Sequence, residues 1–519
     1  MSPHIALSFR RAWAFGLMAI ALTAAGCNAL PKDVERPVSN ALSAPESTAL
    51  GALASARQPA ARRGVSGFAL IDTADAAYAS RLALTEAAQK TLDVQYYAIH
   101  ADASTGELLR AVRDAAARGV RVRILLDDFH STGENAQVMR MAFVPGVEMR
   151  MFNPIPGRRG SGILRALGSL GDFKRMQHRM HNKLYIADNA WGITGGRNLG
   201  EAYFGQSEDS NFVDLDILAA GPVVREMSAS FDHYWNNSLA YPVESLITPD
   251  ELRVLREAAA SQGEAAEKKR PSDLPPPLDL QELALIWAPA ALLADQPAKL
   301  IPEENDEHTE DTVVGGLVSL MEQARRDVLI VSPYFVPGPK MMEVFKGMRE
   351  RGVRIRLLTN SLASNDAPLA HVGYARYRNE LLAIGVEVYE MRALQKQIAR
   401  TVFGSSGGGS KASLHVKAVI MDGRLISIGS MNLDLRSELQ NSEVTLLIRS
   451  TALSKQTEEL IQATLDEGAW RLSLDEGDQL TWHAPPDADF DDAHEEPDTG
   501  LMLRLILKLL GPLAPDEML

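Results

Sequence analysis

One short pattern of residues that can do chemistry occurs twice in this chain. It reads His-x-Lys-x4-Asp, and its two copies, at 181–188 and 415–422, lie 234 residues apart. Imidazole can act as a nucleophile, an acid or a base, and lysine ammonium groups can neutralise anionic oxygens. Two such pairs in one site would supply the groups that cleave a phosphodiester. The six residues that we predict to be catalytic are His181, Lys183, Asp188, His415, Lys417 and Asp422.

The residues after each histidine indicate how the motif is positioned. Residues 415–421 read as a strand, and Asp422-Gly423 reads as a two-residue hairpin turn. Side chains two apart on a strand point to the same face, so His415 and Lys417 would converge on one ligand. The first copy reads alike, with its turn at 188–189. We interpret the two motif aspartates, which lie at these turns, as structural groups rather than proton carriers.

A cluster of small residues with an asparagine follows each copy at the same distance, at 195–198 and 429–432. The two-residue turns would set Gly196 opposite His181 and Ser430 opposite His415, which would leave room for a phosphate beside each imidazole. The asparagines just beyond can donate hydrogen bonds to it. One copy of such a motif could be an ordinary core or edge strand, but two matching copies argue against that. We predict that phosphate is bound by Gly196, Asn198, Ser430 and Asn432.

A larger duplication surrounds the motif. Each half has two apolar runs that flank a helix-like stretch: 92–97, 106–117 and 118–126 in the first, and 327–334, 341–350 and 351–358 in the second. Strand, helix and strand in this order are typical of a βαβ unit. We therefore predict an α/β fold in which each half holds a parallel or mixed sheet flanked by helices.

One carboxylate in each half begins a later strand-like run. These residues are Asp214, which precedes an apolar run to 218, and Glu443, which precedes one to 447. A carboxylate in this place can accept a hydrogen bond from an imidazole N–H and fix the tautomer of a reacting histidine. We predict that Asp214 and Glu443 orient the two histidines. The alternative is that both are exposed carboxylates at strand ends.

With these residues together, the chain resembles the phospholipase D superfamily, whose hallmark is the paired motif. Over roughly residues 67 to 483, several segments resemble its cardiolipin synthase C subfamily: 92–97, 179–183, 195–198, 210–216, 359–366 and 373–376. One departure is His100, where an aromatic residue is expected. The resemblance implies two tandem phospholipase D-like domains about a pseudo-twofold axis, with one active site between them. It also implies a phosphatidyl-histidine intermediate formed without a metal, and cardiolipin made from phosphatidylglycerol with phosphatidylethanolamine or a second phosphatidylglycerol.

The expected reaction gives the two histidines different roles, which could be exchanged. His181 attacks the phosphorus of a phospholipid, while His415 protonates the departing alcohol and then acts as base on the incoming one. The lysines and asparagines hold the nonbridging oxygens, so no metal or other cofactor is expected. A hydrolytic phospholipase D would use the same residues but admit water. A phosphodiesterase acting on nucleic acid is a further alternative, and a noncatalytic envelope lipoprotein is disfavoured because both motif copies are intact.

Composition and net charge indicate which classes of molecule this chain can bind. The 519 residues suffice for two domains with substantial cores, since 46% are hydrophobic and 23% are charged. The net charge of −14 becomes −16 if Arg10 and Arg11 leave with a leader. Nonspecific nucleic-acid binding depends on basic side chains, so this acidity argues against nucleic acid as a partner. We expect phospholipid substrates and a membrane surface as partners, and the sequence identifies no protein partner.

The N-terminal residues have the pattern of a bacterial lipoprotein signal. The arginine pair at 10–11 precedes an apolar run at 12–22, which is too short to span a bilayer. Cys27, the only cysteine in the chain, directly follows Ala25-Gly26. This arrangement resembles a lipobox that is cleaved before Cys27 and acylated on its sulfur. We expect a lipoprotein anchored to the inner or outer membrane of the bacterial cell envelope; an uncleaved anchor or a coincidental cysteine are the alternatives.

The predicted order along the chain is a signal peptide at 1–26, a lipid anchor and flexible tether at 27–65, a first phospholipase D-like domain at 66–260, a linker at 261–280, a second such domain at 281–484, an acidic linker at 485–499 and an amphipathic segment at 500–519. The acidic linker reads as disordered. In the last segment, Arg504 and Lys508 share one helical face and the other positions are largely apolar. This segment is expected either to lie in a lipid interface or to dock on the body with its basic stripe outward.

Overall fold

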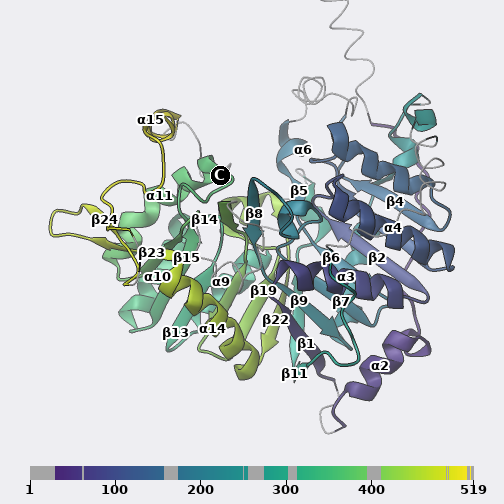
Figure 1. The fold of residues 1–519 in the computed structure, drawn as a ribbon, viewed down its shortest axis with the longest axis horizontal. Helices are drawn as coiled ribbons and strands as arrows, with labels where there is room; N and C mark the ends of the chain where they lie inside the picture. The colour runs from purple at the N-terminus through teal and green to yellow at the C-terminus, as the bar shows by residue number, and fades with distance from the viewer. Residues whose placement is uncertain are drawn as a thin grey trace, which may run out of the picture.

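The protein is represented by a computed structural model that describes residues 30–60, 64–156, 173–248, 250–254, 257, 274–301, 312–393, 411–486, 488, 490–510 and 515. Within these ranges, most strands belong to two nine-stranded sheets, each flanked by helices (Figure 1). The predicted α/β fold class with a mixed sheet in each half is confirmed.

The first sheet belongs to the first half of the chain. In spatial order its strands are β10 (Ala240–Pro242), β4 (Val147–Phe152), β3 (Arg121–Asp127), β2 (Thr91–Tyr96), β6 (Leu184–Ala187), β7 (Trp191–Gly195), β9 (Asp216–Ala220), β1 (Ser66–Ile71) and β11 (Ile286–Ala288). The strands β2, β3 and β4 pair in parallel, and the others pair antiparallel. The main helices are α3 (Ala74–Ala87), α4 (Ala103–Ala117) and α7 (Val223–Trp235).

The second sheet is built in the same way from the second half. Its order is β12 (Ala290–Ala294), β22 (Val444–Arg449), β19 (Leu425–Gly429), β18 (Ala418–Met421), β13 (Asp327–Val331), β15 (Arg354–Asn360), β16 (Glu387–Met391), β23 (Ala469–Leu474) and β24 (Leu480–His483). The main helices are α9 (Val313–Glu322), α10 (Gly338–Glu350), α11 (Pro368–Ala383) and α14 (Thr451–Glu467). Smaller elements are α2 (Ala49–Arg57), α6 (Phe173–Gln177), α13 (Leu435–Leu439), β14 (Phe335–Val336) and β20 (Leu433–Asp434).

The two sheets repeat one topology. Read in opposite directions, β4-β3-β2-β6-β7-β9-β1 corresponds strand for strand to β16-β15-β13-β18-β19-β22-β12. The predicted βαβ units are present as β2-α4-β3 and β13-α10-β15, because the outer strands of each unit pair in parallel. The duplication that the motifs indicated therefore extends through both sheets.

Two short strand pairs and a shared core join the halves. The strand β8 (Ser210–Val213) pairs with β17 (Lys411–Leu414), and β5 (Arg179–Met180) pairs with β21 (Asn441–Ser442). One hydrophobic cluster includes fully buried side chains of β6 and β9 together with side chains of β19 and β22. The region between the sheets is therefore a continuous interior, and burying apolar area there favours one assembled unit.

The two motif hairpins differ by one residue from the prediction. Ala187 pairs with Trp191 and Met421 pairs with Leu425, so each turn has three residues rather than two. The predicted register, and with it the placement of a small residue directly opposite each histidine, is wrong. The strands also begin later than predicted. The strand β6 starts one residue after Lys183, and β18 starts one residue after Lys417. Each His-x-Lys segment is a short irregular stretch that leads into its strand.

The tether predicted at 27–65 is wrong for residues 34–57, which pack on the first half. Arg36 Nε donates to the Ala240 carbonyl at 3.1 Å, and Arg123 Nη1 donates to the Ser39 carbonyl at 2.8 Å. The helix α2 buries Leu50, whose carbonyl accepts from the Trp191 indole at 2.9 Å. The predicted signal peptide at 1–26 and Cys27 lie outside the described residues.

The linker regions also differ from expectation. Residues 261–273 lie outside the described part, whereas 274–280 pack on the first half, where the Leu278 N–H donates to the Ala79 carbonyl at 3.1 Å. Because β11 belongs to the first sheet, strand membership changes at Pro289 rather than at 281. Among the described helices, none combines the length and the apolar character needed to cross a bilayer.

The described residues of the acidic linker at 485–499 pack on the second half, so the prediction that they are disordered is wrong. Trp482 and Ala493 exchange two backbone hydrogen bonds of 2.9 Å, and the Phe490 ring lies 4.7 Å from that of Trp470. The segment leads into α15 (Leu501–Leu510), which projects from the second half (Figure 1).

Candidate active site

Both motif histidines are held by backbone of the opposite half. His181 directly follows β5, and its N–H donates to the carbonyl of Ser442 at 2.9 Å. His415 directly follows β17, and its N–H donates to the carbonyl of Val213 at 2.7 Å. The two short strand pairs therefore extend as far as the histidines and fix each main chain at the junction.

The residue after each of these carbonyls supplies a carboxylate to the same histidine. His181 Nδ1 lies 2.9 and 3.0 Å from the two carboxylate oxygens of Glu443, and His415 Nδ1 lies 2.7 Å from Asp214 Oδ2. Both carboxylates are fully buried, which excludes the alternative of exposed strand-end residues. A neutral imidazole that donates from Nδ1 keeps a lone pair on Nε2, so Nε2 is the atom free to act on a ligand.

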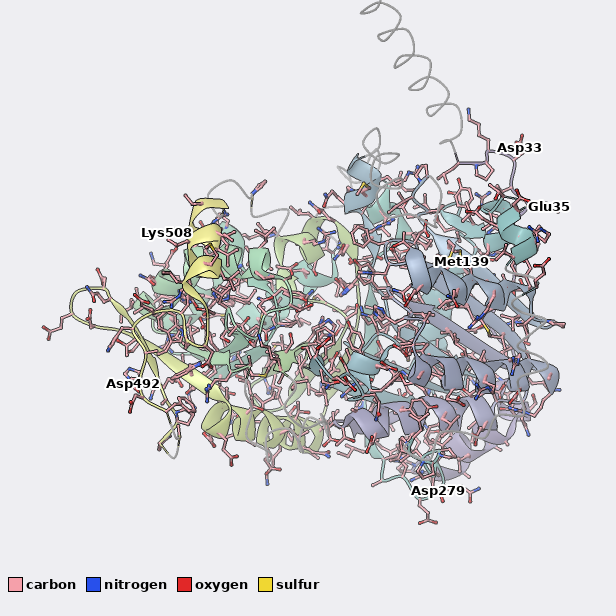
Figure 2. All side chains as sticks on the ribbon, turned by 45° about the horizontal axis from the view of Figure 1, so that its top comes forward. Asp33, Glu35, Met139, Asp279, Asp492 and Lys508 are labelled. Carbon is pink, nitrogen blue, oxygen red and sulfur yellow. The ribbon has the colours of Figure 1, made fainter. Side chains whose placement is uncertain are left out.

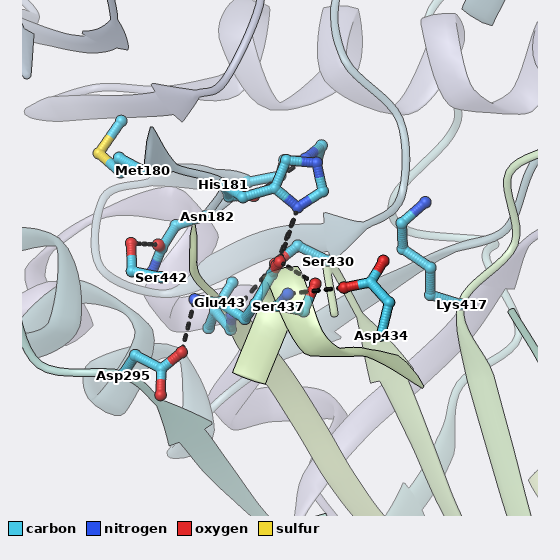
Figure 3. A network of polar contacts seen from close by, with 12 residues as sticks. Met180, His181, Asn182, Asp295, Lys417, Ser430, Asp434, Ser437, Ser442 and Glu443 are labelled. Atoms are coloured by element: carbon cyan, nitrogen blue, oxygen red, sulfur yellow. Dashed lines mark hydrogen bonds and ion pairs between the residues drawn. The ribbon is translucent and has the colours of Figure 1, made fainter. Parts of the chain in front are cut away.

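The two carboxylates have different surroundings. Glu443 also accepts from the hydroxyls of Ser430 at 2.5 Å and Ser437 at 2.9 Å (Figure 3). Burial acts to raise the pKa of Glu443, but His181, Lys183 and Ser430 outweigh it and lower that pKa. Asp214 accepts from the N–H of Leu215 at 2.8 Å, and burial raises its pKa to about 6. Glu443 is therefore the better stabiliser of positive charge on its histidine.

Burial lowers the pKa of all four basic motif groups. The pKa of His181 falls to about 4 and that of His415 falls well below its ordinary value, with the two lysines adding to the effect of burial. The pKa falls to about 7 for Lys183 and about 8 for Lys417, again chiefly through burial. Both imidazoles are therefore neutral at pH 7, and the positive charge of the motifs resides on the lysines.

Each lysine is tied to the histidine of its own motif. Lys183 Nζ donates to the His181 carbonyl at 2.9 Å, and Lys417 Nζ donates to the His415 carbonyl at 2.8 Å. Both lysine side chains are almost completely buried. The pairs thus lie together as the motif spacing predicts, although the bond to the carbonyl, rather than a shared strand face, holds them.

The motif aspartates anchor the hairpin turns. Asp188 accepts from the backbone N–H groups of residues 89–91 at 2.7 to 2.9 Å. Asp422 accepts from those of residues 325–327 at 2.8 to 3.3 Å. Each carboxylate therefore fastens its turn to the start of the central strand, β2 or β13. These contacts agree with a structural interpretation of both residues.

Gly196 and Ser430 contact the orienting carboxylates, which corrects the reason given for their small size. A Cβ on Gly196 would lie 2.3 Å from Asp214 Oδ1 and 2.7 Å from the His415 carbonyl. Ser430 is fully buried and directs its hydroxyl to Glu443. The space next to Gly196 and Ser430 is therefore filled by the carboxylates of Asp214 and Glu443, and phosphate binding by these two residues stays a prediction.

The two asparagines that we predicted to bind phosphate differ in their hydrogen-bond partners. Asn198 Oδ1 accepts from the Ala98 N–H at 3.2 Å, and its Nδ2 donates to the Tyr203 hydroxyl at 2.9 Å. Asn432 is 4% exposed, and its Oδ1 lacks a hydrogen-bond partner among the described residues. That oxygen can accept from an N–H or O–H group of a ligand, whereas a phosphate oxygen would need the Nδ2 donor. Phosphate binding by either residue stays a prediction.

Both histidines and both asparagines line one cavity of about 540 Å³. This volume is in the range of pockets that hold small-molecule groups. The other side chains of its lining larger than alanine are Tyr97, His100, Phe129, His130, Tyr203, Phe212, Tyr334, Asp366, Leu369, Asp434, Arg436 and Asn441. The first half contributes mainly rings, whereas the second contributes most of the charge.

The tyrosines of this lining were not predicted from the sequence to be site residues. The Tyr97 ring lies edge-on to His181, with 5.0 Å between centroids, and the Tyr203 ring lies edge-on to His415 at 5.4 Å. Tyr97 and Tyr334 each come shortly after the first strand of a βαβ unit, and that shared position is the signal that could have found them. His100, the departure from the expected aromatic, lies on the same wall.

Known proteins share this architecture. The family model described as "Cardiolipin synthase, PLD-like domain" matches residues 82–235 and 317–465, which contain one motif copy each. Cardiolipin synthase C of Escherichia coli (strain K12) is 36% identical over 454 residues, 85% of this chain and 94% of that protein. Cardiolipin synthase A of Pseudomonas entomophila (strain L48) is 28% identical over 77% of this chain and 68% of that protein. The crystal structure of phosphatidylserine synthase from Haemophilus influenzae Rd KW20 matches with a TM-score of 0.56 at 14% identity, covers 87% of this chain and 95% of that one, and supports the fold alone.

Proposed function

Because this chain belongs to the phospholipase D superfamily, as a PLD-type phosphatidyltransferase of the cardiolipin synthase family, we propose that it makes cardiolipin through a phosphatidyl-histidine intermediate. The proposed substrates are phosphatidylglycerol with phosphatidylethanolamine, or two molecules of phosphatidylglycerol. The observation that carries the proposal is the pair of buried histidine–carboxylate contacts, exchanged between the halves, at one cavity.

In the first step, His181 Nε2 attacks the phosphorus of the donor phospholipid. The bond from phosphorus to the headgroup oxygen breaks, and His415 gives a proton to that oxygen as the alcohol leaves. The phosphodiester anion that enters the cavity favours the protonated form of His415. The products of this step are phosphatidyl-His181 and the free headgroup alcohol.

In the second step, His415 removes a proton from a glycerol hydroxyl of phosphatidylglycerol. The resulting oxygen attacks the phosphorus, the nitrogen–phosphorus bond breaks, and His181 returns to its neutral form. Lys183, Lys417 and Asn432 hold the nonbridging oxygens in both steps, because charge on these oxygens must be balanced where water is scarce.

The surroundings of the carboxylates support His181 as the nucleophile. An imidazole phosphorylated on Nε2 and protonated on Nδ1 carries positive charge. Glu443 meets that charge with two oxygens and is kept anionic by two hydroxyl donors. Asp214, whose burial raises its pKa to about 6, suits a histidine that passes a proton back and forth.

Product analysis tests this function. The purified protein is incubated with defined phosphatidylglycerol and phosphatidylethanolamine, and the lipids are identified by mass spectrometry. Cardiolipin together with free ethanolamine or glycerol supports transfer. Phosphatidic acid in place of cardiolipin would instead establish hydrolysis, because water would then have taken the phosphatidyl group.

We also propose that the protein is a lipoprotein of the bacterial cell envelope, anchored through Cys27. The support is the apolar run that leads to Ala25-Gly26-Cys27, and the fact that both proposed substrates are membrane lipids. Labelled palmitate should enter the wild type and fail to enter Cys27→Ser. A wild type that takes up no label would remove this part of the proposal.

A further inference from the structure

The C-terminal helix α15 leaves a continuous apolar surface uncovered. The exposed fractions of its apolar side chains are 68% for Leu501, 71% for Met502, 47% for Leu505, 43% for Ile506 and 74% for Leu509. At about 100° per residue, these five side chains span an arc of about 140° on one side of the helix. Such a surface on a water-facing helix normally marks a contact with something apolar.

The opposite side of α15 is fastened to the body, so the helix is held in place. Leu507 is buried, and α15 contacts α11. The segment that leads into the helix is held by ion pairs: Glu496 lies 2.8 Å from Arg378 of α11, and Asp498 lies 3.1 Å from Arg392. This arrangement turns the apolar arc outward, and Figure 1 shows α15 at the edge of the second half, beyond α11.

The helix α11, which carries α15, also forms part of the cavity rim. Its first turn supplies Leu369 and Ala370 to the cavity lining, and Ala367, which caps the helix, lines it too. Leu369 is 48% exposed, and Phe129, on the cavity wall from the first half, is 38% exposed. Apolar side chains are therefore exposed both at the cavity and on α15, the helix that contacts α11.

We propose that α15, together with Leu369 at the cavity rim, docks on the surface of a phospholipid membrane and holds the cavity mouth against its substrate. This inference rests on the proposed function, in which both substrates are membrane lipids. The five apolar side chains of α15 enter the acyl boundary, as in other interfacial amphipathic helices.

Charge complementarity selects the membrane as the occupant. Lys508 is exposed and borders the apolar arc, at the outer edge of the second half in Figure 2. Arg504 follows on the same border and contacts Glu495. Basic side chains beside an apolar arc match an anionic headgroup layer such as that of phosphatidylglycerol. Lys508 therefore presents a cation where the headgroups would lie, whereas the charge of Arg504 is paired with Glu495.

A site-specific probe tests docking without turnover. Cys27 is the sole cysteine of the chain, so Cys27→Ser combined with Leu505→Cys gives one attachment point for a fluorescent dye. Vesicles of phosphatidylglycerol and phosphatidylethanolamine with brominated acyl chains quench a dye that enters the hydrocarbon. We expect quenching at position 505 and none at Val38→Cys, a matched exposed position on the first half. No quenching at position 505, or equal quenching at both positions, would overturn the proposal. It would also be overturned if, without vesicles, a second copy of the chain already covered the dye at 505.

A kinetic comparison tests whether docking serves the cavity. The rate on vesicles is divided by the rate on the same headgroups carried by short acyl chains below their aggregation concentration. Leu505→Ser with Leu509→Ser should lower this ratio by at least about tenfold, because two apolar side chains that would enter the membrane are lost. Leu505→Ile with Leu509→Ile, and Val38→Ser, should retain it. An unchanged ratio, or an equal loss on both substrates, contradicts docking. A wild type that forms no product from either substrate refutes the proposed function instead, and the quenching result still decides docking.

Discussion

His415 Nδ1 lies 2.7 Å from Asp214 Oδ2, although the two residues are 201 positions apart and belong to different halves of the chain. The mirror contact joins His181 to Glu443 across 262 positions. Neither half therefore contains a complete histidine–carboxylate pair of its own. The site forms only when the two halves dock, and this explains why the strand pairs β8–β17 and β5–β21 end at the histidines.

The two carboxylates should differ when each is neutralised. Glu443→Gln removes the anion that stabilises phosphorylated His181, so kcat/KM should fall about 10²- to 10⁴-fold for every substrate. Asp214→Asn should impair proton transfer to the leaving group. Its fall in kcat/KM should therefore be smaller when the leaving group is nitrophenol, which needs no proton. Steady-state rates with a natural and a nitrophenyl phosphodiester measure the difference. Equal losses for both variants on both substrates would contradict the division of roles.

The pH dependence of kcat/KM should have an alkaline limb near the pKa values of the motif lysines. Lys183, with a pKa of about 7, and Lys417, with one of about 8, are protonated below these values and lose their charge above them. Capture of an anionic phosphodiester should therefore weaken as pH rises from 7 to 9. In Lys183→Arg the limb should move to higher pH, because arginine stays charged. Lys455→Arg, on the exposed face of α14, is the control and should keep the wild-type profile.

Several features of the site could be predicted from the sequence because they depend on local pattern. The repeated motif, the βαβ units and the carboxylates at 214 and 443 follow from residue types and spacing along the chain. The exchange of carboxylates between halves could not, because it depends on how two sheets dock. The same holds for the acidic segment: Glu496 is fixed by Arg378, 118 residues away, and acidic composition alone gives no sign of that partner.

The hairpin turns show a finer limit. Both Asp-Gly at 422–423 and Asp-Asn at 188–189 favour a two-residue turn, yet each turn takes a third residue. The motif aspartate begins each turn at a φ of 53°, and its carboxylate binds three backbone N–H groups of a neighbouring segment. This tertiary contact overrides the local preference, and it shifts the register by one residue.

Asp188 should matter for stability rather than for proton transfer. Asp188→Ala would leave the N–H groups of residues 89–91 without their acceptor, and Asp188 and Thr91 are buried. The free energy of unfolding should fall by at least about 1–3 kcal/mol. Denaturant titration measures this change, and kcat at low temperature should remain within severalfold of wild type. A collapse of kcat with unchanged stability would make Asp188 a proton carrier.

Activity should survive exhaustive chelation. The lysines already supply positive charge to the motifs, and the described residues contain no group of three His, Cys, Asp or Glu side chains arranged to hold a metal ion. Rates are measured before and after treatment with EDTA and a zinc-specific chelator. A loss of activity that one added metal ion restores would contradict the two-histidine mechanism.

The covalent intermediate should be trappable on one histidine only. In His415→Ala the nucleophile remains but proton transfer is lost, so a phosphodiester with an activated leaving group should still phosphorylate His181. The adduct should persist, because no base activates the incoming alcohol. His181→Ala should form no adduct with the same reagent. Intact-protein mass spectrometry followed by peptide mapping distinguishes the two variants.

An adduct on His415 in His181→Ala, with none in the reciprocal variant, would exchange the roles of the two histidines. An adduct on neither, beside an active wild type, would show that the acceptor attacks phosphorus directly and that His181 is not a covalent catalyst.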